Sequence, residues 1–318
     1  MKNMFLLLLA LISNIIYADN GQFRIAGSAT VYPFITLAVE QFAGKSSHNA
    51  AIVENIGTGG GIRLFCSNKI NMAAASRKIK FDETNYCAKN NIEEKEIGEI
   101  IIGYDGIVIA NSNSSHLVSL SSKDLFFALA KNIPYQGRII SNPYNKWNEV
   151  NPLLPNYNIE IYGPSHNSGT RDALIDLVIG KYCEGLEEMK IIYPNKDKRH
   201  KVCKEIREDG KFIEVGENYN LIIQKIKLNN KSFGIFGFNF YSNNIDIIQA
   251  ALIDNISPSI QSISSKEYKL SRPLYLYYKK ADLTNLALKA FIEELTSKDA
   301  ISENGYLTKA GLVTGIDK

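Results

Sequence analysis

The chain of 318 residues has little net charge, few histidines and cysteines, and a single long apolar run. Its formal net charge is +3, and no run of Lys and Arg alternates with aromatic residues, so nucleic acid is not an expected partner. None of the four histidines stands in an HExxH motif or at another metal-ligand spacing, so no metal and no cofactor is expected. A Gly-x-Ser-x-Gly elbow is also absent, which leaves a hydrolase nucleophile without sequence support.

The long apolar run lies at the start of the chain. Lys2 precedes the apolar stretch 5–12, and Ala18 is a small residue at a suitable distance, which is typical of a secretory signal peptide. We predict a signal peptide over residues 1–18; the alternative is an uncleaved anchor, because Ile16 stands where a small residue is preferred. No Cys follows the cut, so lipid attachment is not expected, and no later segment is long enough to span a membrane. The remaining chain of about 300 residues predicts an exported protein of two lobes.

The four cysteines fall into two pairs. Cys66 and Cys87 are about as far apart in sequence as Cys183 and Cys203, and no CxxC motif is present. Export permits disulfides, so the spacing favours Cys66–Cys87 and Cys183–Cys203. Four buried thiols are the alternative.

Three short turns rich in Gly, Ser and Thr each precede an apolar run with helical spacing. They are 27–30, 57–61 and 168–171. A helix N-terminus has unpaired N–H groups and a partial positive charge, and glycine lets the backbone close around a ligand. Three such turns indicate a site for a small oxyanion. Residues Ile62 and Arg63 follow the second turn in place of the Lys-Ser/Thr pair of a nucleotide P-loop, so ATP is not expected.

Two arginines accompany these turns. Arg171 lies in the first turn of its expected helix, where a bound anion would relieve its conflict with the helix dipole. Arg77 follows Ser76 at the end of the apolar segment 71–75, and ligands of open α/β sheets bind beyond the carboxyl ends of strands. The alternatives are surface arginines, with Arg171 paired to a neighbouring aspartate.

The order of elements predicts an α/β architecture. A strand, a turn, a helix and a further strand alternate from residue 22 to residue 75, the pattern of a parallel sheet with helices. Two glycine-bearing strands, near Asp105 and near Ile235, are the expected crossings between lobes. The predicted division is lobe I over 19–106 and 236–318, and lobe II over 107–235.

An ordered set of motifs resembles the periplasmic phosphate-binding protein of the phosphate ABC transporter. The motifs are Ala26–Phe34 (AGSATVYPF), Gly57–Ile62 (GTGGGI), Ala75–Arg77 (ASR), Tyr104–Val108 (YDGIV), Trp147–Pro155, Ser168–Arg171 (SGTR) and Ser232–Gly237 (SFGIFG). Each motif is weak by itself, but together they run in order over nearly the whole mature chain. The resemblance implies the two-lobed periplasmic-binding-protein fold with two chain crossings, and a monomer that binds inorganic phosphate and delivers it to an inner-membrane ABC permease from the periplasm, without enzymatic activity.

The resemblance and the turns together predict the phosphate-binding residues. The resemblance implies donors from Thr30, Val31 (backbone N–H), Thr58, Ser76, Ser168, Gly169 and Thr170, and the turns and arginines add Ser28, Gly59, Arg77 and Arg171.

This chain also departs from the family pattern. Pro164 stands where many members have an arginine, and Arg77 stands where many have the aspartate that accepts the proton of hydrogen phosphate. Asp105, Asp172 and Glu217 are candidate replacements for that aspartate. A receptor for sulfate or molybdate is the alternative function, and a secreted phosphatase using both arginines is the third.

Overall fold

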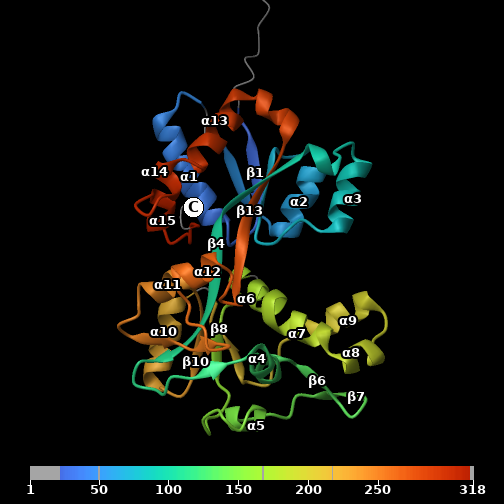
Figure 1. Cartoon of the computed structure of the whole chain (residues 1–318), viewed down its shortest axis with the longest axis vertical. Coiled ribbons are helices and arrows are strands. Elements are labelled where there is room, and N and C mark those ends of the chain that lie inside the picture. The colour runs from blue at the N-terminus through green and yellow to red at the C-terminus, as the bar shows by residue number, and fades with distance from the viewer. Residues whose placement is uncertain (1–21, 49–50, 167, 217, 316–318) are drawn as a thin grey trace, which may run out of the picture.

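The computed structural model describes residues 22–48, 51–166, 168–216 and 218–315. The predicted signal peptide over 1–18 and the candidate Glu217 lie outside the described residues. Two bodies are stacked along the long axis, and strands β4 (Ile97–Ser112) and β13 (Ser271–Lys279) run between them (Figure 1). No helix among the described residues has both the length and the apolar composition needed to cross a membrane.

Lobe I is built on the sheet order β2-β1-β3-β13-β4. Strands β1 (Arg24–Gly27), β2 (Ile52–Asn55) and β3 (Met72–Ala75) are parallel, and β13 lies antiparallel to both β3 and β4. The three parallel strands are those that the alternating pattern predicts, and β13 and β4 make the sheet a mixed one. The helices of lobe I are α1 (Tyr32–Lys45), α2 (Thr58–Cys66), α3 (Phe81–Lys89), α13 (Leu286–Leu295), α14 (Lys298–Ile301) and α15 (Tyr306–Lys309), with 3-10 turns at Glu94–Glu96 and Lys280–Thr284.

Local sequence explains the geometry of the first two turns. Strand β3 has the sequence MAAA and is buried at every position, as expected of a strand covered on both faces. Gly27 ends β1 against this strand, and a Cβ at that position would lie 1.9 Å from the Ala74 carbonyl oxygen. Pro33 then opens α1, where its missing N–H costs nothing. The first turn is therefore held close to the end of β3.

Lobe II continues the same sheet through β4. Strand β10 (Phe233–Gly237) is antiparallel to β4, and β8 (Ile161–Gly163) and β9 (Phe212–Glu214) follow it in parallel, while β11 (Ile248–Ala250) pairs with the end of β4. Two small sheets pair β5 (Ser119–Leu120) with β12 (Leu252–Ile253) and β6 (Asn132–Tyr135) with β7 (Arg138–Ser141). The helices are α4 (Ser122–Leu129), α5 (Trp147–Val150), α6 (Gly169–Leu174), α7 (Gly180–Gly185), α8 (Glu187–Ile192), α9 (Lys196–Cys203), α10 (Tyr219–Leu228), α11 (Phe238–Ser242) and α12 (Ile260–Ser264), and a π-helical segment (Ile175–Ile179) joins α6 to α7.

The first crossing between the lobes lies within β4. Strand β4 pairs with β13 up to Gly106, opposite Ser271, and with β10 from Ile107 onward, opposite Gly237. Asp105 therefore stands at the junction of the two lobes.

The second crossing differs from the prediction. Residues 236–270 do not return to lobe I: Phe236, Ile248, Ile263 and Leu270 all lie in the hydrophobic core of lobe II. Gly237 begins α11 instead of leaving the lobe, and the buried Tyr268 hydroxyl donates to the Ile107 carbonyl. The chain returns through β13, so lobe II spans 107–270, and α11 and α12 belong to the lower body (Figure 1).

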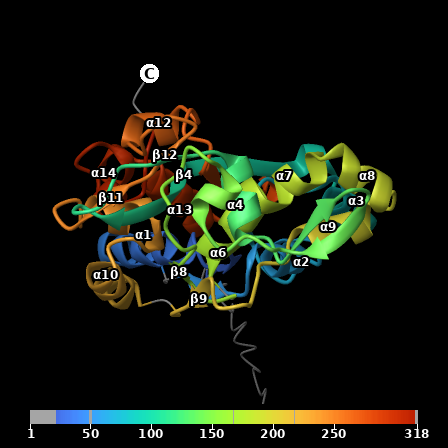
Figure 2. The same ribbon diagram turned by 90° about the horizontal axis from the view of Figure 1, so that it is seen from below.

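Each disulfide lies within one lobe. Cys66–Cys87 joins α2 to α3, and Cys183–Cys203 joins α7 to α9, with no free cysteine among the described residues. These are the predicted pairings. Both ribbon views place α7, α8 and α9 on the same side of the molecule as α2 and α3 (Figures 1 and 2).

Candidate functional site

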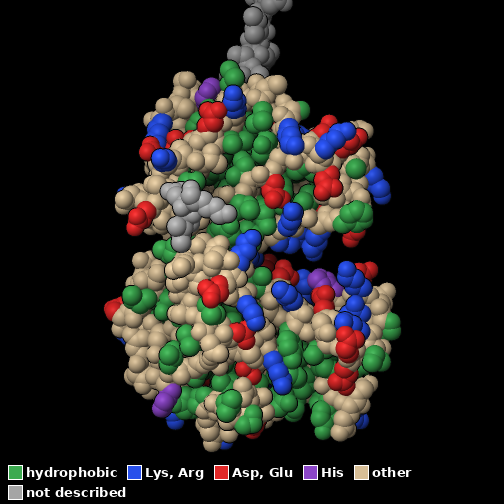
Figure 3. Space-filling model, viewed as in Figure 1, with side chains coloured by type: hydrophobic (Ala, Val, Ile, Leu, Met, Phe, Trp, Pro, Cys, Tyr) green, Lys and Arg blue, Asp and Glu red, His purple; other side chains and the backbone are tan. Residues whose placement is uncertain are grey.

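A cavity of about 420 Å³ lies between the lobes. Lobe I contributes the second turn and the end of β3, and lobe II contributes the start of α6 and residues near its end. This cleft cavity is lined by six of the predicted residues, which are Ser28, Thr58, Gly59, Ser76, Arg77 and Gly169. Lys and Arg side chains gather on both sides of the cleft (Figure 3). The basic residues that line the cleft cavity include Arg77 and Lys80 of lobe I and Lys204 of lobe II.

The second turn is preorganised by its own hydrogen bonds. Gly57 begins α2 with φ of 78°, a conformation that L side chains rarely adopt. The Thr58 hydroxyl accepts from the Ser76 backbone N–H at 3.2 Å and shares a hydrogen bond with the Ser76 hydroxyl, also at 3.2 Å. The two hydroxyls are therefore held together at the cavity wall, where they can turn toward a ligand.

Arg77 lines the cleft cavity but already has a partner. Its Nη1 and Nη2 donate to the two carboxylate oxygens of Glu83 at 2.8 Å each, a bidentate pair. Burial opposes ionisation of Glu83, but the hydrogen bonds and charge of Arg77 outweigh it and hold the pKa of that carboxyl below its usual range. The charge of Arg77 is therefore largely compensated within lobe I.

Arg272 is the site residue that sequence reasoning missed. It lies at the second position of β13, is only 6% exposed, and lines the cleft cavity at the junction of the lobes. Its Nη2 donates to the Thr30 hydroxyl and to the Gly169 carbonyl, both at 2.9 Å, and it pairs with Asp105 at 3.4 Å. One buried guanidinium thus connects the first turn, the third turn and β4. The available signal was an arginine at the start of the otherwise apolar strand SRPLYLYYK.

The two described candidate carboxyls lie in different places. Asp172 lines the cleft cavity, where partial desolvation and the nearby Asp176 carboxylate raise its pKa. Asp105 lies on the other side of Arg272, and burial raises its pKa although Arg272 opposes that rise. Of these two, only Asp172 faces the cavity that contains Thr58 and Ser76.

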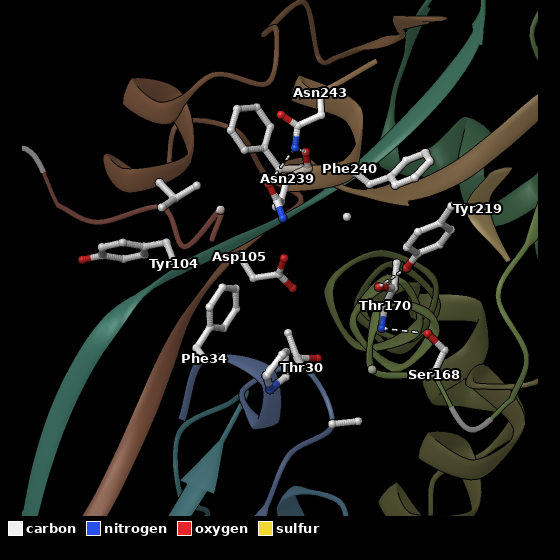
Figure 4. A pocket seen from close by; sticks show the side chains of 18 of the residues that line it. Thr30, Phe34, Tyr104, Asp105, Ser168, Thr170, Tyr219, Asn239, Phe240 and Asn243 are labelled. Carbon is white, nitrogen blue, oxygen red and sulfur yellow. Dashed lines mark hydrogen bonds between the residues drawn. The ribbon is translucent and has the colours of Figure 1, made fainter. Parts of the chain in front are cut away.

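The third turn and Thr30 face a second cavity of about 580 Å³. Thr30, Ser168, Gly169 and Thr170 line it, together with Asp105 and several aromatic side chains (Figure 4). The Ser168 hydroxyl accepts from the Thr170 N–H at 3.2 Å and so caps α6. We call this the aromatic cavity. Gly169 lines both cavities, and a Cβ at that position would lie 2.1 Å from the Thr30 hydroxyl, so the lobes approach each other closely there.

Two predicted residues lie at neither cavity. Arg171 donates to Glu214 and packs with its guanidinium over the Phe212 ring, 4.8 Å from the ring centroid. The turn of the helix that carries Gly169 to the cleft directs residue 171 toward β9, so Arg171, which was predicted as an anion ligand, lines neither cavity. Val31 is fully buried, and its N–H donates to the Ser28 carbonyl at 3.1 Å, so this donor serves the turn itself.

Among the described residues, no group of three or more His, Cys, Asp or Glu side chains is arranged to hold a metal ion. The site is thus made of hydroxyls, the guanidinium groups of Arg77 and Arg272, the ammonium groups of Lys80 and Lys204, and carboxyls with raised pKa. Such a set can bind an oxyanion by hydrogen bonds.

Comparisons with known proteins agree on one family. A family model described as a PBP superfamily domain matches residues 18–299. The chain is 30% identical to Protein SphX of Synechocystis sp., over 85% of this chain and 72% of that protein. It is 28% identical to the phosphate-binding protein PstS of Staphylococcus haemolyticus, over 90% of this chain and 81% of that protein.

Solved structures share the fold. A possible phosphate-binding protein from Planctomyces limnophilus matches with a TM-score of 0.68 at 23% identity, covering 93% of each chain. PstS from Borrelia burgdorferi matches with a TM-score of 0.65 at 19% identity, covering 93% of this chain and 99% of that one. At these identities the likeness establishes the two-lobed fold.

Proposed function

The chain belongs to the PBP superfamily, and from this membership we propose that it captures inorganic phosphate between its lobes and delivers it to an ABC permease. Two of its relatives are named as a phosphate-binding protein and as SphX, and both are similar over most of their length. The protein binds and releases its ligand without chemistry, as expected of a transport receptor and not of a phosphatase.

The observation that carries the proposal is the meeting of both lobes around the cleft cavity. Thr58 and Ser76 of lobe I, Gly169 of lobe II and Arg272 between them line one space. We place the phosphate at the boundary near Gly169. There a phosphate oxygen is a better acceptor for Arg272 than the neutral Gly169 carbonyl, because its negative charge attracts the guanidinium in addition to the hydrogen bond.

Asp172 is our candidate for the carboxyl that recognises the proton of hydrogen phosphate. It lines the same cavity, and in its ionised form it accepts a hydrogen bond from a protonated oxyanion. Sulfate has no proton near neutral pH and would face this carboxylate without a hydrogen bond. This favours phosphate over sulfate and molybdate.

The cellular location, oligomeric state and partner of the protein follow from the same proposal. Residues 1–18 would direct export, and the mature chain would act in the periplasm as a monomer beside an inner-membrane ABC permease. Thiol labelling and fractionation of the expressed protein would test this setting.

Isothermal titration of the purified mature protein with phosphate, sulfate and molybdate tests the function. Phosphate should bind at least about a hundredfold more tightly than sulfate, a difference of ~2.7 kcal/mol. Equal binding of sulfate would replace the phosphate assignment with that of a general oxyanion receptor. No binding of any of the three anions would overturn the proposal.

A further inference from the structure

The aromatic cavity is larger than inorganic phosphate requires. Its volume of about 580 Å³ lies in the range of about 300–1,000 Å³ that is typical of sites for small organic ligands. It adjoins the cleft cavity, because Ala29, Asn55 and Gly169 line both. The Arg272 contacts to Thr30 and Gly169 lie at this common boundary. A phosphoryl group held there would have open space beside it.

The side chains that line this cavity are of the kinds that bind a hydroxylated organic group. Phe34, Phe238 and Phe240 offer ring faces and edges, and Tyr219 packs against Phe240 with ring centroids 5.0 Å apart. Aromatic surfaces of this kind pack against the C–H faces of polar organic molecules. The aromatic lining gives inorganic phosphate nothing to bind.

Polar groups stand among these rings. Asp105 points into the cavity between Phe34 and Asn239 (Figure 4). Its carboxylate accepts hydrogen bonds, and the amide of the exposed Asn243 both donates and accepts them. The Thr170 hydroxyl, 3.0 Å from the Tyr219 hydroxyl, adds a further pair of groups on the opposite wall. Carboxylate, amide and hydroxyl groups beside aromatic rings suit a ligand with several hydroxyls.

We propose that the site also accepts phosphate monoesters of small polyols or sugars, with the phosphoryl group at the Arg272 boundary and the hydroxylated carbon skeleton in the aromatic cavity. This inference rests on the proposed function, because it uses the same phosphoryl position. It extends the ligand class from the inorganic ion to its esters.

Gly237 provides a test that leaves the phosphoryl position intact. It lines the aromatic cavity but not the cleft cavity, and an added Cβ would meet no described atom within 4 Å. Its backbone, with φ of −74° and ψ of 150°, is open to any residue with a side chain. The series Gly237→Ala, Gly237→Leu and Gly237→Trp therefore fills the cavity in steps. Gly44→Leu in α1, where an added Cβ also meets nothing within 4 Å, is the matched control.

The experiment is calorimetric titration of each folded variant with inorganic phosphate and with glycerol 3-phosphate. The wild type and Gly44→Leu should bind both. Gly237→Trp should lose at least about tenfold in affinity for glycerol 3-phosphate and less than about twofold for phosphate, with Gly237→Ala close to the wild type. If the wild type binds phosphate but not glycerol 3-phosphate, the inference is overturned and the proposed function stands. If the wild type binds glycerol 3-phosphate but Gly237→Trp does not lower that affinity, the proposed placement of the carbon skeleton in the aromatic cavity is wrong. If neither ligand binds, the proposed function itself has failed, and the inference with it.

Discussion

Replacing Arg272 with lysine is the sharpest test of the proposed site. The substitution keeps the positive charge but removes the fork with which one nitrogen reaches Thr30 and Gly169 and another reaches Asp105. If an anion takes part in this network, its charge-assisted hydrogen bonds contribute roughly 1.5–3 kcal/mol, and a lysine ammonium recovers only part of that. Phosphate affinity should therefore fall in Arg272→Lys, by less than the roughly tenfold to 150-fold that complete loss of these hydrogen bonds would cause.

Arg171→Lys is the matched control for this measurement. Arg171 also pairs with a carboxylate, that of Glu214, but its guanidinium packs over Phe212 outside both cavities. Its phosphate affinity should change by less than about twofold. Titration calorimetry gives both values, and circular dichroism with thermal melts confirms that both variants fold. Unchanged affinity in Arg272→Lys together with a large loss in Arg171→Lys would refute the assignment of the anion to the Arg272 boundary.

Four further predictions follow from the structure. Thr58→Ala should weaken phosphate binding by roughly tenfold, because it removes a hydroxyl from the cavity wall; unchanged titration would exclude that turn from the site. Asp172→Asn should raise sulfate affinity while phosphate affinity falls, as measured by competition, and a parallel loss of both anions would rule this carboxyl out as the discriminating group. Glu83→Gln should lower the free energy of unfolding by about 1 kcal/mol at pH 7. Because the pKa of Glu83 is lowered in the folded protein, the stability advantage of the wild type should shrink as the pH falls below about 4.3 and vanish below the folded-state pKa. Urea titrations of both proteins at pH 7 and pH 3 would show this change. Removing the Cys66–Cys87 disulfide by a double serine substitution should cost about 3 kcal/mol of unfolding free energy in the chain-entropy model, and denaturant curves that match the wild type would contradict it.

Local patterns in the sequence were sufficient for the N-terminal part of lobe I. Strand, turn and helix alternate through residues 24–75, and each transition has its own signal, such as Gly57 at positive φ or Pro33 at a helix start. The glycines near Asp105, Gly103 and Gly106, lie in the part of β4 that pairs with β13. These features depend on residues that are adjacent in the sequence, so the sequence alone is enough to predict them.

The differences between prediction and structure concern features that depend on distant partners. The second crossing was placed at residue 236 because SFGIFG has the composition of a crossing strand, yet Ile248 and Leu270 pack into lobe II and keep the chain there. Arg171 was predicted at the site because it follows Ser-Gly-Thr, but its direction is set by β9, which lies some forty residues further along. Arg272 was missed because its role appears only when β13 lies beside Asp105 and the third turn.

The placement of the two disulfides has a mechanical consequence. Cys66–Cys87 and Cys183–Cys203 each fasten two helices of one lobe, and the only strands that carry the chain from lobe to lobe are β4 and β13 among the described residues. Neither disulfide joins the two lobes, so oxidation stiffens each lobe without restraining the angle between them. The redox state of the compartment can therefore change the stability of each lobe while the angle between the lobes stays free of any disulfide restraint.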